Sequence, residues 1–256
     1  MALAPTVKIW QPFAPFHLHS ARVLCKKAIE IEDLHDGSKQ IAEALKDEHM
    51  AYVTGSIFAV VAFLEALINE TFLKAVGFTE GDLHNGVLQK LAPAVITSMA
   101  HAWEFGTDWS SEPSFRQFLE YIRRNLPERW FVLDKYQLAL YLADKYPYSK
   151  PFDTKGQLWG DMTLIIDLRN YLTHHKPEWI AFSPEAEPYK AEKDQTTRLL
   201  RELGKRNFAN QLYPGQGSIV NLLGSKCASW AVSSSITFVK EFKDKMPLDL
   251  SSIPEL

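Results

Sequence analysis

The sequence predicts an all-α fold, a bundle of long helices with a helical insertion before the last one. Apolar residues recur at intervals of three and four along most of the chain, which is the period of a helix packed on one side. No run of alternating apolar and polar residues is long enough to predict a sheet. Hydrophobic residues make up 46% and charged residues 23% of the 256 residues, which excludes a mainly disordered chain.

The first two predicted helices cover residues 17–35 and about 38–76. Ser38 is the expected N-cap of the second helix, and Gly77 is its expected C-terminal stop. This helix contains the longest uncharged apolar run of the chain, fifteen residues over 50–64. A membrane span needs about 20 such residues. We therefore expect a buried central helix, no membrane association and a soluble, cytoplasmic protein.

The remaining helices are expected over residues 85–104, 114–125, 128–145, 157–174, 189–203 and 220–245. Pro93 should kink or split the first of these. Six basic and five acidic residues lie between Glu185 and Arg206, so the helix over 189–203 is expected to be solvated. We interpret residues 178–218 as an insertion in a single domain whose core covers residues 17–176 and 219–246.

Composition and motifs exclude several classes of function. The net charge of −3 argues against a strongly basic nucleic-acid coat, although a local RNA site needs only a local patch. The phosphate-binding, dinucleotide-binding and nucleophile-elbow glycine motifs are absent from the sequence. No histidines or cysteines stand at metal-ligand spacing, and Cys25 and Cys227 read as buried thiols of a reducing compartment. We expect no cofactor and no metal.

One predicted helix, residues 157–174, carries an unusual polar pattern near its end. Asp167, Asn170 and His174 fall on one narrow stripe, which Thr163 extends toward the start of the helix. Arg169 stands about 140° away from His174 on the helical wheel, on the mostly apolar side. Two interpretations remain open here. Either the stripe faces water and Arg169 forms a buried ion pair, or Arg169 belongs to a functional site.

The pattern Arg169, Asn170 and His174 resembles the motif of the HEPN superfamily (higher eukaryote and prokaryote nucleotide-binding domains). That motif is Arg, four to six residues and then His, often with a polar residue directly after the Arg; here four residues, beginning with Asn170, separate Arg169 from His174. The helix over residues 60–70 resembles an early core helix of such proteins, and residues 227–242 resemble a closing helix. The resemblance covers about residues 50–245, without the insertion. The chain departs from the commonest pattern after the His, where His175, Lys176 and Pro177 replace a small residue.

The resemblance implies a metal-independent endoribonuclease, in which two protomers of a homodimer bring their motifs to one cleft. It also implies a setting in toxin–antitoxin systems or phage defence, with an antitoxin protein as partner. His174 would act as the acid–base group, and Arg169 would bind the scissile phosphate of an RNA. Asn170, four residues before His174, would position the ring or the substrate.

Other residues are weaker candidates for the same site. Glu65 and Asn69 lie four apart on the central helix and could pair with Arg169 and Asn170. Asp167 is a further candidate because it shares the polar stripe of Asn170 and His174. His175 is an alternative acid–base group that we expect to be merely exposed. Cations and aromatic residues mix around Arg123 and Arg124, a pattern that fits RNA contact or an ordinary helix surface.

Three functional hypotheses follow. The first is the ribonuclease. The second is a non-catalytic module of the HEPN type that binds a nucleotide or a protein partner. The third is a helical scaffold in which Arg169 is sealed in an ion pair, for example with Glu65, and His174 has no role. The environment of Arg169 distinguishes the third hypothesis from the others.

Overall fold

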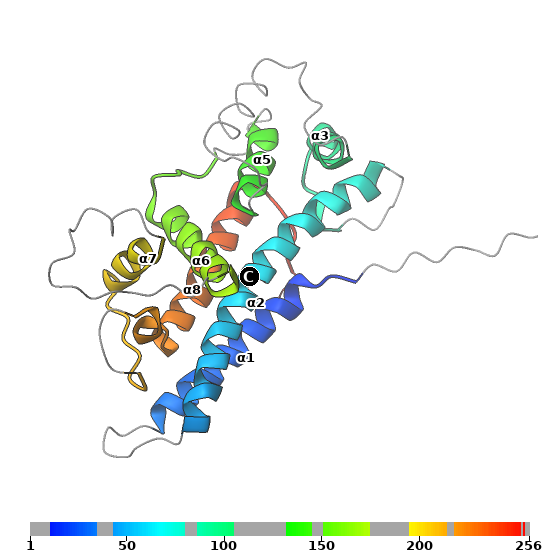
Figure 1. Cartoon of the computed structure of the whole chain (residues 1–256). Coiled ribbons are helices and arrows are strands. Elements are labelled where there is room, and N and C mark those ends of the chain that lie inside the picture. Colours follow the sequence, from blue (N-terminus) through cyan, green and yellow to red (C-terminus); the bar gives the residue numbers. More distant parts are fainter. Residues whose placement is uncertain are drawn as a thin grey trace, which may run out of the picture.

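The described part of the chain is helical, and the predicted all-α class is confirmed. The computed structural model describes residues 11–34, 43–79, 86–104, 132–144, 151–174, 195–213, 218–251 and 253. These contain no strand and form α1 (Ala14–Asp33), α2 (Glu43–Thr79), α3 (Pro93–Glu104), α5 (Val132–Asp144), α6 (Gln157–His174), α7 (Gln195–Gly204) and α8 (Ser225–Lys245), with short 3-10 helices η1 (Gly86–Leu88) and η3 (Ile219–Leu222) (Figure 1).

Three details differ from the sequence prediction, and one expectation, the effect of Pro93, is confirmed. α2 continues to Thr79, so Gly77 as a stop is wrong; glycine permits a helix end but does not impose one. Pro93 splits its predicted helix, as expected: η1 ends at Leu88 and α3 begins at the proline. The last predicted helix is also split. α8 begins after Gly224, where an added Cβ would lie 2.9 Å from the carbonyl oxygen of Ala209. The predicted N-cap Ser38 and the helix over 114–125 lie outside the described residues.

The third correction concerns α7, which the charge pattern predicts to be a solvated helix. Leu199 and Leu203 are buried, at 1% and 0% exposure, and α7 packs on α6 and η3. The charged residues of this helix occupy the opposite side, where Arg198 and Arg201 are exposed. The insertion therefore contributes one apolar face to the core. Counting the charged residues of the segment does not reveal this face, because the face consists of only two leucines, which stand four residues apart on one side of the helix.

α2 is the central element of the fold. It packs against α1, α3, α5, α6 and α8. α1 runs antiparallel beside it, while α6 and α8 lie across its other side (Figure 1). An 18-residue window within Glu43–Gly77 has a mean hydropathy of 2.0, so α2 could cross a membrane by length and composition alone. Only half of that window is buried in the protein.

The ends of α1 are tied to α2 and α8 by carboxylates. Glu70 of α2 accepts hydrogen bonds from the backbone N–H groups of Phe13 and Ala14 at 2.6 and 3.0 Å, at the first turn of α1. Glu70 therefore satisfies N–H groups that the start of a helix leaves unpaired. In the middle of α1, Ser56 Oγ of α2 donates a buried hydrogen bond of 2.9 Å to the carbonyl of Ala21.

At the other end of α1, Glu32 joins three helices. Its Oε1 accepts from Nε2 of His49 on α2 at 2.8 Å and from the backbone N–H of Ser225 on α8 at 2.6 Å. Ser225 Oγ donates to Oε2 at 2.5 Å. His49 is fully buried, and its Nδ1 has no hydrogen-bond partner. Burial raises the pKa of Glu32, but the hydrogen bonds from His49 and Ser225 outweigh it, so the pKa is lowered.

An aromatic cluster attaches α5 to α2 and α8. Tyr136 of α5 is fully buried and donates a hydrogen bond of 2.9 Å to the carbonyl of Leu64. Its ring meets Phe238 and Phe242 of α8 edge-on, at centroid distances of 5.0 and 4.7 Å. Phe152 stacks on Phe238 at 4.5 Å. Such contacts add to the burial of each ring and fix the place of α5.

Replacing Glu32 should destabilise the fold and reduce its sensitivity to acid. Glu32→Ala leaves His49 and the first turn of α8 without their acceptor, so we expect the free energy of unfolding at pH 7 to fall by about 3 kcal/mol. A lowered pKa in the folded state stabilises the protein above the ordinary glutamate value of about 4.3, and this contribution is lost as the pH falls through the folded-state pKa. Urea unfolding between pH 3 and pH 7 (roughly the titration range of carboxylates) checks both expectations.

The matched control is Glu30→Ala, on the same helix. Glu30 is exposed and pairs with Lys26 and Lys27 on the surface, so this change should leave stability nearly as it is. Equal effects of the two substitutions would contradict the structural role of Glu32, as would an unchanged acid slope in Glu32→Ala.

Candidate functional site

The candidate motif lies in the last two turns of α6. The helix stays regular to His174, the final residue that the structure assigns to it. Arg169 and Asn170 are half-buried, and His174 is exposed. Arg169 precedes His174 by five residues, which gives about 140° of rotation and a rise of about 7.5 Å. The two side chains of one chain therefore leave the helix in different directions.

Arg169 has no ion pair or side-chain hydrogen bond with any residue in the described ranges. Apart from the bonds of the helix backbone, its carbonyl oxygen accepts a hydrogen bond of 2.9 Å from Thr173 Oγ1. Its partial exposure lets the stem lie among apolar residues while the guanidinium reaches water. Within this part of the chain, the buried ion pair of the scaffold hypothesis is not found.

The proposed partners of the motif on α2 have other contacts. Asn69 Oδ1 accepts a hydrogen bond of 2.7 Å from Lys135 Nζ of α5, instead of pairing with Asn170. Glu65 is exposed, and its charge acts on Lys135. Burial lowers the pKa of Lys135, and Glu65 offsets part of that effect. Among the described contacts, neither Glu65 nor Asn69 is found paired with Arg169 or Asn170. Helical spacing shows which residues share a face, but not which neighbouring helix they meet.

Asp167 is held by α7, a contact that the sequence did not reveal. Its Oδ2 accepts a hydrogen bond of 2.7 Å from Arg198, whose side chain is 54% exposed. Burial raises the pKa of Asp167, and the charge of Arg198 counteracts this only in part. The polar stripe of α6 is thus covered by α7 at Asp167 and open at His174. The i to i+4 spacing of charges within a helix could not have predicted Arg198, because it stands 31 residues away.

A second pair ties α7 to the start of α6. The guanidinium of Arg206, just beyond α7, pairs with Asp161 and donates a hydrogen bond of 2.9 Å to the carbonyl of Glu202. It also lies over the ring of Trp230 on α8, 4.9 Å from the centroid. Two arginines therefore anchor α7 along α6, and neither of them is Arg169.

The remaining candidates lie outside the described residues. These are His175 and the cationic and aromatic group around Arg123 and Arg124. Among the described residues no group of three or more His, Cys, Asp or Glu side chains could hold a metal ion.

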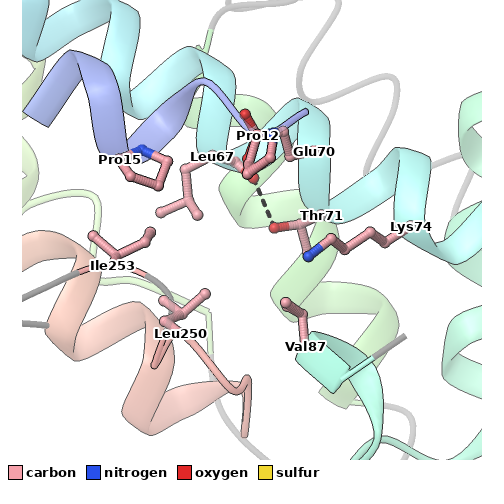
Figure 2. A pocket seen from close by; sticks show the side chains of 9 residues that line it. All are labelled: Pro12, Pro15, Leu67, Glu70, Thr71, Lys74, Val87, Leu250 and Ile253. Atoms are coloured by element: carbon pink, nitrogen blue, oxygen red, sulfur yellow. Dashed lines mark hydrogen bonds between the residues drawn. The ribbon is translucent and has the colours of Figure 1, made fainter. Parts of the chain in front are cut away.

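One small pocket lies far from the motif in sequence, between the start of α1, α2 and the C-terminal segment (Figure 2). Glu70, Thr71 and Lys74 supply its polar groups, and Thr71 Oγ1 is already bonded to the carbonyl of Leu67. Burial lowers the pKa of Lys74, an effect that Glu70 and Asp249 oppose. The cavity volume of about 20 Å³ holds about one water molecule, so this pocket does not admit a nucleotide.

Comparison of the chain with protein-family models, with curated proteins and with solved structures found no match.

The two members of the Asp167–Arg198 pair should differ in their effect on stability. A raised pKa in the folded state means that ionised Asp167 opposes folding at neutral pH, and that its contribution becomes favourable only as the pH falls. Asp167→Asn should therefore leave the free energy of unfolding at pH 7 unchanged or slightly higher. Arg198→Ala removes the only described cation beside Asp167, so it should lower the free energy of unfolding at pH 7 by about 1 kcal/mol.

Urea unfolding of both variants at pH 7 measures this difference. A larger loss of unfolding free energy in Asp167→Asn than in Arg198→Ala would contradict the prediction, because it would show that the pair stabilises the fold through the charge of Asp167.

Proposed function

We propose that this protein is a metal-independent endoribonuclease of the HEPN type, with Arg169 and His174 as its catalytic residues. The observation that supports this most is the state of Arg169. A half-buried guanidinium without an acidic partner in the described structure is available for an external anion. It lies little more than one turn before an exposed histidine, at the end of a helix.

The chemistry needs only these residues and the RNA. His174 removes the proton from a ribose 2′-hydroxyl, whose oxygen attacks the adjacent phosphorus. A bond forms between O2′ and phosphorus, and the bond between phosphorus and O5′ breaks, with a histidine returning a proton to the leaving oxygen. The products are a 2′,3′-cyclic phosphate and a 5′-hydroxyl. Arg169 binds the phosphate with two parallel hydrogen bonds and stabilises its growing negative charge, while Asn170 orients the substrate.

The divergence of Arg169 and His174 on one helix favours a site shared by two chains. A second protomer supplies the missing group to each phosphate, which is why the proposal includes a homodimer. RNA as substrate and an antitoxin protein as partner rest on the family resemblance, and the cytoplasmic setting rests on the sequence, whose longest uncharged apolar run is shorter than a membrane span.

The same divergence favours one alternative function, a non-catalytic module of this type that binds a nucleotide or a protein partner. A half-buried arginine and an exposed histidine that never meet on one phosphate still bind an anion. The experiment below distinguishes the two functions.

The decisive measurement is cleavage of a mixed RNA pool in excess EDTA. Wild type is expected to cut RNA and to leave 2′,3′-cyclic phosphate ends, while Arg169→Ala and His174→Ala should each lose at least about 100-fold in rate. The matched controls are Arg201→Ala and His19→Ala, which remove exposed residues of the same types from α7 and α1 and should cut like wild type.

Circular dichroism should show all four variants to be folded. Cutting by Arg169→Ala and His174→Ala at the wild-type rate would reject the assigned site. RNA binding by wild type without cleavage, weakened by Arg169→Ala but not by Arg201→Ala, would favour the binding module instead.

A further inference from the structure

Arg198 of α7 lies on the same side of α6 as His174. Its guanidinium donates a hydrogen bond of 2.7 Å to Oδ2 of Asp167. Asp167 precedes His174 by seven residues, so the two side chains leave the helix only about 20° apart on the helical wheel. Arg169, in contrast, stands about 140° from His174. Within one chain, it is therefore Arg198, and not Arg169, that shares the side of α6 with the histidine.

The direction of α7 places Arg198 at the end of α6 that carries the motif. Arg198 binds Asp167, whereas Arg206, eight residues later in the chain, binds Asp161, six residues earlier on α6. α7 therefore runs antiparallel to α6, beside which it lies (Figure 1). Asn170 stands on the same stripe of α6, between the level of Asp167 and that of the motif histidine. This side of the motif thus combines a guanidinium, an amide and an imidazole.

The contact with Asp167 uses only part of the guanidinium of Arg198. An arginine has five N–H donors in a flat fork, and the hydrogen bond to Asp167 comes from one of its terminal nitrogens. The side chain is 54% exposed, so donors of the fork can meet a ligand that comes from the water. Burial raises the pKa of Asp167 in spite of the arginine, which means that the pair does not compensate for the buried carboxylate. An exposed ion pair of this kind contributes little to stability, so a stronger anion can compete for the arginine.

A phosphate group of a nucleic-acid strand matches such an arginine. The guanidinium fork binds two phosphate oxygens through parallel, charge-assisted hydrogen bonds, which makes arginine well suited to phosphate recognition. Asp167 and His174 are about 10.5 Å apart along the helix axis. An RNA strand that has one phosphate at His174 and follows the stripe of α6 therefore brings a neighbouring phosphate to Arg198.

We propose that Arg198 is a substrate-binding residue, which holds an RNA phosphate next to the one at His174 of the same chain. This inference rests on the proposed function, because that function makes RNA the ligand. It assigns a role to α7, which lies in the insertion and outside the Arg169–His174 motif. It also specifies the substrate as a strand that continues beyond the scissile phosphate, since a single phosphodiester has no second phosphate for Arg198.

An RNA oligonucleotide with 2′-O-methyl groups throughout tests this contact without cleavage, because it has no free 2′-hydroxyl. Fluorescence anisotropy of a labelled oligonucleotide of mixed sequence measures its dissociation constant. Arg198→Ala should weaken binding about 10-fold. Each lost phosphate contact also reduces the release of counterions, so the slope of log Kd against log salt concentration should fall by roughly 0.7 between about 50 and 200 mM salt. A purely structural role of Arg198 would not change this slope.

Two further variants separate the contact from general effects of charge. Arg201→Ala is the matched control, because Arg201 is 55% exposed on the same helix but pairs with Glu202 of α7 itself. On the helical wheel Arg201 points away from Leu199 and Leu203, the buried residues of α7, and it should bind RNA like the wild type when replaced. Arg198→Lys keeps the charge and loses the fork, so it should retain the salt slope of wild type.

The outcomes distinguish this inference from the ribonuclease. Wild-type affinity and slope in Arg198→Ala overturn the inference, as does an equal loss in Arg201→Ala or a wild type that binds no oligonucleotide. Cleavage of unmodified RNA in EDTA tests the ribonuclease separately. A wild type that binds through Arg198 but never cuts rejects the ribonuclease and keeps the contact. A wild type that cuts RNA, with an Arg198→Ala variant that binds normally, keeps the ribonuclease and rejects the contact. Circular dichroism should show that every variant is folded.

Discussion

The need to cover α2 shapes the rest of this structure. A helix of 37 residues that is apolar on nearly every side cannot stand at the edge of a protein in water. α1, α3, α5, α6 and α8 all pack against it, and each covers a different part of its length or circumference. The other helices of the described chain are shorter, so no one of them can cover α2 alone. The fold is therefore organised around this helix and not as a symmetrical bundle of equivalent helices.

Carboxylates of neighbouring helices bind the first turns of α1 and α8 and so fix how these helices pack. Neither α1 nor α8 is capped by the side chain of its own N-cap residue, which is Phe13 in one case and Gly224 in the other. Glu70 and Glu32 bind the N–H groups at these helix starts instead, and a negative charge there also complements the helix dipole. Because the capping carboxylate comes from another helix in each case, the same hydrogen bonds that cap a helix also hold two helices together.

The sequence predicts the elements of this fold better than their contacts. The period of apolar residues is a property of each helix alone, so it predicts α2 and the exact span of α6. Where a helix ends depends both on the local preferences of its residues and on tertiary packing, which is why α2 continues through Gly77. Partners depend on which helices come together in space. The sequence therefore placed Asp167 and Asn69 on the right faces but missed Arg198 and Lys135 as their partners. It also missed His49, because a buried polar residue at the start of an apolar run looks like a flanking residue.

The Glu32 contact has a consequence for the order in which the chain folds during synthesis. α1 and α2 are neighbours in sequence and can pair early, since contacts of short separation form fastest. Ser225 follows Glu32 by 193 residues, so its N–H and hydroxyl reach the carboxylate only when the last helix has left the ribosome. Until then, Glu32 and His49 form the exposed end of an unfinished core. Closure of the N-terminal layer by α8 is thus a late step, and a chain cut short before α8 leaves Glu32 and His49 without the helix that covers them.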